Sequence, residues 1–140
     1  MNGYSNYKTA NVETADQGKL ILLVYDCAIR SCKLANENMG EERTEDRSNA
    51  LIKAQRAIAE LMGSLNMEVG GEIATNLYRL YEYMTRRLIE ANIKIDSAPV
   101  KEVLGLLQNL REAWASAIDA ERQNKTRVSL EGSEGLAMVG

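Results

Sequence analysis

Apolar residues recur along most of the chain in alternating steps of three and four positions, which places them on one side of an α-helix. Three rows of this kind are complete. They consist of Leu51, Ala54, Ile58, Leu61 and Leu65; of Ile73, Leu77, Leu80, Met84 and Leu88; and of Val100, Val103, Leu107, Leu110, Trp114 and Ala117. The same alternation forms the seam between helices that pack with a left-handed crossing. The rows therefore predict helices that each bury one side.

Short polar or glycine-containing stretches divide the chain into four helical segments. We expect helices at about 15–39, 46–66 and 72–94, and a fourth that begins near Pro99 and ends near Arg122. Gly70 and Gly71 suit a tight reversal between the second and third helices. Similar helix lengths and short connections favour antiparallel neighbours. The sequence predicts an all-α protein, an antiparallel up-down four-helix bundle.

The two ends of the chain differ from the predicted bundle, which we assign to residues 15–124. Residues 1–14 are polar, and we expect them to form an N-terminal arm. Residues 125–140 are polar and contain glycine with a few apolar residues, so we expect a flexible C-terminal tail.

The first helix has apolar residues on two sides. We expect one side to face the bundle, and it consists of Leu20, Leu23, Val24, Cys27, Leu34 and Ala35. Leu22 and Ile29 then fall on the opposite side, bordered by Tyr25 and Cys32. Either this helix is packed on two neighbours, with Leu22 and Ile29 at its edges or under the N-terminal arm, or the second side is a groove for a partner's helix or extended segment. Both hold if the arm covers the groove until the partner arrives.

Every tyrosine and tryptophan ring of this chain carries a polar group, because the sequence has six tyrosines and one tryptophan but no phenylalanine. Three of the tyrosines lie in "NLYRLYEYM" at 76–84. Tyr81 flanks the seam of the third helix, while Tyr78 and Tyr83 fall near its opposite borders. A tyrosine at such a border buries its ring and keeps its hydroxyl in water or hydrogen-bonded. This pattern fits both a protein-binding groove and the edge of a core.

The composition excludes several classes of protein. The net charge is -3 and the basic residues are dispersed, which argues against a nucleic-acid partner. The longest strongly apolar run, "LILLVY" at 20–25, is too short to span a bilayer, and residues 1–19 lack the apolar core of a signal peptide. We expect a cytoplasmic protein with no direct insertion into a membrane, in which Cys27 and Cys32 are reduced thiols.

The sequence contains no histidine, which removes most zinc sites, the Glu-x-x-His pairs of di-metal bundles and the usual pairing of a nucleophile with a base. It also contains no glycine-rich phosphate loop with its lysine. We therefore expect no enzyme activity, no cofactor and no metal site.

Five motifs in order resemble the family of the bacterial flagellar export chaperone FliS. They are Tyr7 ahead of "NVETA", "LILLVYDCAI" at 20–29, "GGEIATNLYRLYEYM" at 70–84, "LIEAN" at 88–92 and "LREAW" at 110–114. The resemblance implies a four-helix bundle that binds the disordered C-terminal segment of flagellin in the cytoplasm, prevents its premature polymerisation and presents it to the membrane gate of the flagellar type III export apparatus. It also implies that the arm with Tyr7 lies over part of the binding surface, and it admits other flagellar regulators as partners.

The partner-binding residues that we predict are Tyr7, Leu22, Tyr25, Ile29, Tyr78, Tyr81 and Tyr83. The alternative is a generic helical adaptor or a homodimer whose apolar side pairs with itself.

Overall fold

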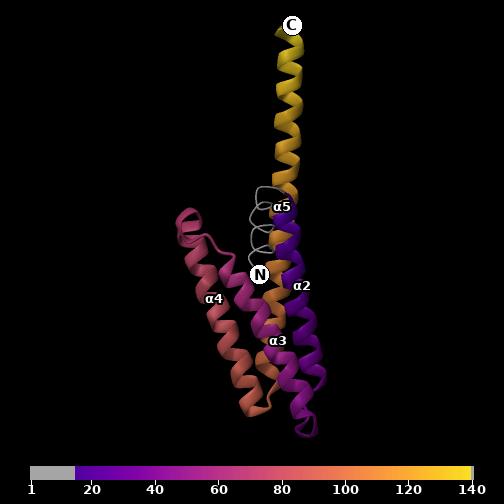
Figure 1. The fold of residues 1–140 in the computed structure, drawn as a ribbon, viewed down its shortest axis with the longest axis vertical. Coiled ribbons are helices and arrows are strands. Elements are labelled where there is room, and N and C mark those ends of the chain that lie inside the picture. The colour runs from indigo at the N-terminus through magenta and orange to yellow at the C-terminus, as the bar shows by residue number, and fades with distance from the viewer. Residues whose placement is uncertain (1–14, 140) are drawn as a thin grey trace, which may run out of the picture.

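The protein is an all-α bundle in which successive helices run antiparallel (Figure 1). The structure, a computed structural model, describes the backbone of residues 15–139 and the side chains of residues 17–130. Within this part of the chain lie four α-helices and one short 3-10 helix. Their bounds are α2, Ala15–Glu37; η1, Glu41–Arg43; α3, Thr44–Gly63; α4, Met67–Lys94; and α5, Ser97–Val139. The helices α2 and α4 each pack against α3 and α5, which confirms the predicted bundle.

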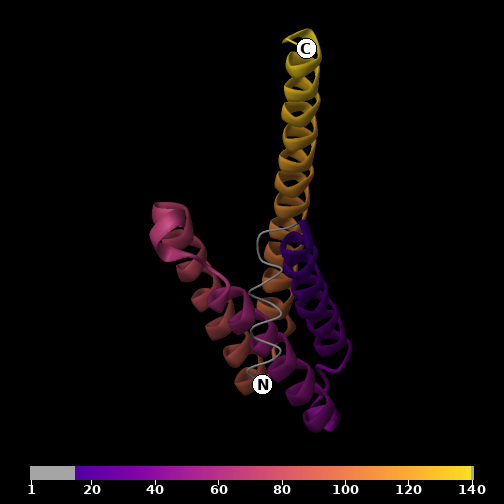
Figure 2. The ribbon, with the colours of Figure 1, turned by 45° about the horizontal axis from the view of Figure 1, so that its top comes forward.

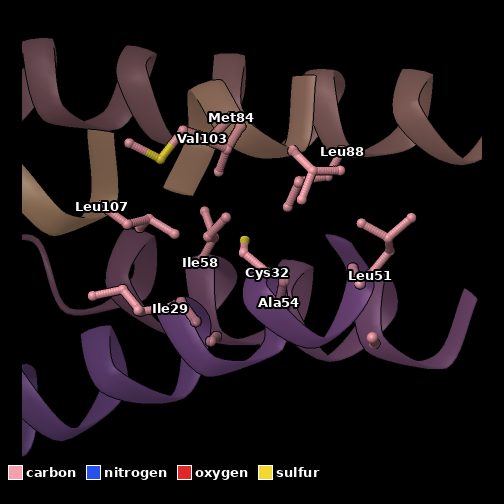
Figure 3. Close-up of a cluster of buried hydrophobic side chains, with 14 of the residues drawn as sticks. Ile29, Cys32, Leu51, Ala54, Ile58, Met84, Leu88, Val103 and Leu107 are labelled. Carbon is pink, nitrogen blue, oxygen red and sulfur yellow. The ribbon is translucent and has the colours of Figure 1, made fainter. Parts of the chain in front are cut away.

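Most of the predicted core rows are buried. Figure 3 shows side chains from all four helices meeting in one cluster, among them Leu51, Ala54, Ile58, Met84, Leu88, Val103 and Leu107. Ile73 and Ala117 are exceptions, because both side chains are exposed. Ile73 belongs to the first part of α4 and Ala117 to α5. Figure 2 shows that the start of α4 diverges from α2 and α5.

The prediction for the two sides of α2 is wrong for most of its residues, although Ala35, predicted for the core, is buried and Val24 and Cys27 pack partly buried against the core cluster. Its core side consists of Tyr25, Ala28, Ile29, Cys32 and Ala35, whereas the side chain of Leu23 is 60% exposed and that of Leu34 is 50% exposed. The buried residues follow unbroken steps of three and four, and Ile21 continues the row. The row predicted for the core is interrupted between Cys27 and Leu34 by Arg30 and Ser31. A row without charged residues is the better core seam.

The α4 helix begins at Met67, whereas the sequence predicts a start near Glu72. One helical turn precedes Gly71, which breaks the helical geometry with φ 52° and ψ -125°. Asn66 caps this turn, since its Oδ1 accepts a hydrogen bond from the backbone N–H of Val69 at 3.1 Å. A positive φ with this ψ favours glycine, so Gly71 sets the direction in which α4 leaves the turn.

The α5 helix continues to Val139, so the predicted helix end near Arg122 is wrong. Residues 123–131 contain neither glycine nor proline, and Lys125 forms an ion pair with Glu121 one turn earlier, at 3.3 Å between Nζ and Oε1. The side chains of residues 121–130 are exposed. The extension projects beyond the other helices in Figure 1. That residues 125–140 form a flexible tail stays a prediction.

Candidate functional site

An apolar groove lies between α2 and α3 on the outside of the bundle. It has a volume of about 370 Å³ and is lined by Leu20, Leu23, Val24 and Cys27 of α2 and by Lys53, Arg56, Ala57 and Glu60 of α3. Buried alanines on α3, at positions 50, 54 and 57, allow the two helices to approach closely. We call this surface the α2–α3 groove.

The α2–α3 groove continues in both directions along the two helices. Towards η1 it joins a more polar hollow that shares Lys53 and reaches Leu34, Asn38 and Arg43. In the opposite direction it joins a small apolar hollow that shares Leu20 and extends to Gln17. At 1.5 Å per residue, the stretch of α2 from Gln17 to Leu34 is roughly 26 Å long. A helical segment of similar length would fit along it.

A second apolar groove lies at one end of the bundle, where Figure 2 shows the start of α4 diverging from α2 and α5. It has a volume of about 290 Å³, and we call it the end groove. Val69 and Ile73 of α4 lie on one side of it with exposed fractions of 85% and 73%, opposite Ile21 of α2 and Trp114 of α5. It shares Gln17 and other residues with the small hollow described above, so the two grooves are continuous.

The opposite end of the bundle is closed by a buried arginine. Arg47 is 2% exposed. Its Nη1 donates a hydrogen bond to the carbonyl oxygen of Gly40 at 2.9 Å, and its Nε donates to Oδ1 of Asn92 at 3.1 Å. These bonds place the positive charge near the C-terminal ends of α2 and α4, where helix dipoles favour a cation. The end groove has no corresponding closure among the residues that line it.

Three of the predicted partner-binding residues lie in the core. Tyr25 and Tyr81 are 0% and 1% exposed, their hydroxyl groups are hydrogen-bonded to each other, and Ile29 is 8% exposed. Burial raises the pKa of both tyrosines, and the bond to Tyr81 raises that of Tyr25 further. The indole of Trp114 lowers both values in part. These three side chains therefore offer little surface to a partner, although Tyr81 lies at the inner wall of the end groove.

The other predicted residues do not form one surface. Leu22 is half-buried on α2, and Tyr78 is exposed on α4. Tyr83, also on α4, donates a hydrogen bond to Oε1 of Glu102 at 2.7 Å, and this bond raises the pKa of Tyr83. Tyr7 lies outside the described residues. That these residues contact a partner stays a prediction.

Sequence reasoning missed most of the residues that line the two grooves, although Tyr81, which it predicted, lines the end groove. The pattern identifies Leu20, Leu23 and Val24 as apolar but assigns them to the core, although Arg30 and Ser31 interrupt their row. Val69 falls in a stretch interpreted as a turn. Gly71 breaks the helix between Val69 and Ile73, so helical spacing could not identify Val69 as part of an apolar surface.

The grooves offer apolar surface for a protein segment. Within the described residues, no group of three or more histidine, cysteine, aspartate or glutamate side chains is placed to hold a metal ion. None of the described helices has both the length and the apolar content needed to cross a membrane. Apolar grooves between helices are suited to bind an amphipathic helix or an extended segment of another protein.

Comparisons with known proteins assign the chain to a family. A family model described as "Flagellar protein FliS" matches residues 1–121. The flagellar secretion chaperone FliS of Bacillus subtilis (strain 168) is 36% identical over 136 residues, which are 97% of each chain. The FliS chaperone of Salmonella typhimurium is 38% identical over 117 residues, covering 80% of this chain and 87% of the relative. The flagellar secretion chaperone FliSB of Pseudomonas aeruginosa is 36% identical over 105 residues, covering 75% and 83%. The chain belongs to the FliS family of flagellar proteins.

Proposed function

We propose that the protein is a cytoplasmic export chaperone that binds the disordered C-terminal segment of flagellin. It holds flagellin unpolymerised and presents the loaded complex to the membrane gate of the flagellar export apparatus. The observation that carries this proposal is the continuous apolar surface formed by the α2–α3 groove and the end groove. The names of its relatives, which are flagellar secretion chaperones, support the same role.

The energetics favour a partner that uses several parts of this surface. Burying one leucine or isoleucine side chain stabilises a complex by roughly 1.5 to 3 kcal/mol, while ordering a disordered backbone costs roughly 1 to 2 kcal/mol per residue. A single exposed leucine therefore cannot hold a long segment. Leu23, Leu34, Val69 and Ile73 together provide exposed apolar side chains along both grooves. Contact with the whole surface offsets the cost of ordering a longer segment.

The position of the grooves explains how the chaperone stays folded while it binds. The α2–α3 groove lies outside the core cluster of Leu51, Ile58, Met84 and Leu107, so a segment enters it without displacing a core side chain. The bound apolar side chains of flagellin are then covered and unavailable for polymerisation. The outer surface of α4 remains free for a further partner, such as the export gate.

Calorimetric titration with the last few dozen residues of the cognate flagellin tests this proposal. We expect a one-to-one complex that Leu23→Glu weakens by about tenfold or more, since a charge replaces a leucine that the bound segment would cover and 1.4 kcal/mol corresponds to a factor of ten. The matched control is Ile93→Glu, which changes an apolar side chain of α4 that is 76% exposed, against 60% for Leu23, and that lines neither groove. Circular dichroism verifies that both variants remain helical.

Two outcomes would contradict the proposal. The first is that the wild-type protein does not bind the flagellin segment. The second is that Leu23→Glu and Ile93→Glu bind as the wild type does, which would remove the α2–α3 groove from the model. Sedimentation of the pure protein tests the alternative function, a homodimer. A tight dimer that dissociates in the Leu23→Glu variant would indicate that the groove serves self-association.

A further inference from the structure

The α3 side of the α2–α3 groove carries two positive charges that have no hydrogen-bonding or ion-pair partner among residues 17–130. Lys53 and Arg56 both line the groove and both side chains are exposed. Within residues 17–130, neither makes a hydrogen bond or an ion pair. Arg87, by contrast, is paired with Glu90 and with Glu102, each at 2.8 Å.

The opposite side of the groove is uncharged at the same level. Leu20, Leu23, Val24 and Cys27 of α2 face Lys53 and Arg56 across it. The groove is therefore asymmetric, with an apolar side on α2 and a cationic side on α3.

The charge on the α3 side also changes along the groove. Asp46 lines the hollow towards η1, and Glu60 lies at the other end of the α2–α3 groove. Lys53 and Arg56 thus form a cationic centre between two acidic positions. Because residues three apart on a helix are neighbours on its surface, the two cations present a matched pair to one segment in the groove.

We propose that the α2–α3 groove selects an amphipathic helical segment whose apolar side is bordered by a row of carboxylates that lie over Lys53 and Arg56. This inference rests on the proposed function, because it specifies the chemistry of the flagellin segment that occupies the groove. The apolar side of the segment packs on Leu20, Leu23 and Val24. Two carboxylates three or four residues apart match the spacing of Lys53 and Arg56.

The two kinds of contact have different effects on binding. Exposed ion pairs add little to affinity, whereas complementary charge raises the association rate and suppresses wrong orientations. A helix turned about its own axis, or shifted towards Glu60, would place carboxylates against leucines or against another carboxylate. The apolar contacts thus supply most of the affinity, and the charges set the orientation of the bound segment.

A pair of designed peptides tests the inference. Both have about eighteen residues, the number that spans the groove as a helix. They share the same apolar positions and differ only at the bordering positions, which are glutamate in one and lysine in the other. We expect the wild-type protein to bind the glutamate peptide about tenfold more tightly at low salt, with a preference that shrinks as salt is added.

Charge reversal in the protein should invert this preference. The variant Lys53→Glu/Arg56→Glu is expected to bind the lysine peptide more tightly. The matched control is Lys101→Glu/Arg86→Glu, which changes the net charge equally at exposed positions on α5 and α4 outside the grooves. The control should keep the preference of the wild type. All four substituted positions are exposed, and circular dichroism verifies that both variants stay folded.

Equal binding of the two peptides by the wild type, or an unchanged preference after reversal at Lys53 and Arg56, would overturn the inference. The same variants are then titrated with the flagellin segment. Binding by the wild type that is unaffected by the reversal leaves the proposed function standing and removes the charge selection. Failure of the wild type to bind the flagellin segment removes the proposed function and, with it, flagellin as the occupant.

Discussion

Tyr25 and Tyr81 share a hydrogen bond between their hydroxyl groups in the centre of the bundle. The two residues belong to α2 and α4, which pack chiefly against α3 and α5 and lie diagonally across the bundle. The bond therefore links two helices that otherwise make few direct contacts. Tyr81 also lines the inner part of the end groove, so the bond lies where α4 begins to diverge.

Removing both hydroxyl groups should destabilise the protein by less than the sum of the two single removals. Tyr25→Phe and Tyr81→Phe each leave a buried hydroxyl without this partner, at a cost of about 1 to 2 kcal/mol. The double variant should cost less than the sum of the two, because no hydroxyl remains unpaired. Urea unfolding measures the three free energies. Strictly additive values would show that the two hydroxyls are not coupled.

The stability of the protein should fall at alkaline pH. Burial raises the pKa of Cys32 from 9.0 to about 12, and burial raises the pKa of Tyr25 and Tyr81 above 10.0. The unfolded chain therefore releases these protons first, and the folded state loses stability as pH rises above about 9 for the thiol and above about 10 for the phenols.

Each of these groups lowers the free energy of unfolding by up to about 1.4 kcal/mol per pH unit within its window. Urea unfolding between pH 8 and pH 11 measures the slope. The variant Tyr25→Phe/Tyr81→Phe should show a shallower slope above pH 10 than the wild type. An equal slope in the two proteins would show that the buried tyrosines do not cause the loss.

Cys27 offers a direct measure of occupancy of the α2–α3 groove, because it lines the groove and is half-buried. Cys32 is an internal control, since it is buried and burial raises its pKa. A thiol reagent reacts with the thiolate, so we expect Cys27 to be alkylated first. The bound flagellin segment should slow this reaction, as followed by mass spectrometry. Alkylation of Cys27 at the same rate in the complex would show that the segment lies elsewhere.

Gly18 is required by the close approach of α2 to α5. A Cβ atom at this position would lie 2.8 Å from Cδ1 and 3.0 Å from Cγ1 of Ile118. Alanine favours the helix by about 1 kcal/mol over glycine, but we expect the overlap to outweigh this gain, so that Gly18→Ala destabilises the wild type. In an Ile118→Ala background the same substitution should stabilise by about 1 kcal/mol. Thermal unfolding of the wild type, the two single variants and the double variant measures the sign of the stability change in each background. A stabilising Gly18→Ala in the wild type would contradict the packing argument.

The extension of α5 should exchange its amide protons much faster than the bundle. The side chains of residues 121–130 are exposed, and a helix without tertiary packing is marginally stable in water. Hydrogen exchange should show weak protection from about Lys125 onward and strong protection around Leu88 and Leu107. Protection of the extension equal to that of the core would show that it is held by a partner, such as a second copy of the chain.

The sequence was sufficient for most of the fold because α3, α4 and α5 each have one apolar row and a clearly polar opposite side. Leu51, Met84 and Leu107 could be placed in the core from spacing alone. The first helix was different, since apolar residues surround it and periodicity does not distinguish its two sides. The choice depended on Arg30 and Ser31, which interrupt one of the two rows.

The sequence indicated that the candidate site is an apolar surface on the first helix, but it did not indicate which side of that helix is exposed. An excess of apolar residues on the first helix indicated a binding surface, yet the side that remained exposed was the one expected to be buried. The divergence of α4 depends on the backbone of Gly71, and the sequence marks this glycine only as a probable turn. Val69 and Ile73 are exposed at this end of the bundle, and their exposure follows from the three-dimensional arrangement.

The ion pair between Asp26 and Arg111 has a consequence for α2, which carries apolar residues on more than one side. Its shorter contact, from Nε of Arg111 to Oδ1 of Asp26, measures 2.6 Å and ties one edge of α2 to α5. Rotation of α2 about its axis would exchange leucines for isoleucine and cysteine in the interior at little hydrophobic cost. The carboxylate of Asp26 and the hydroxyl of Tyr25 oppose that rotation, because each would lose its partner. A few polar atoms thus decide which apolar residues of α2 are kept inside and which stay exposed on the surface.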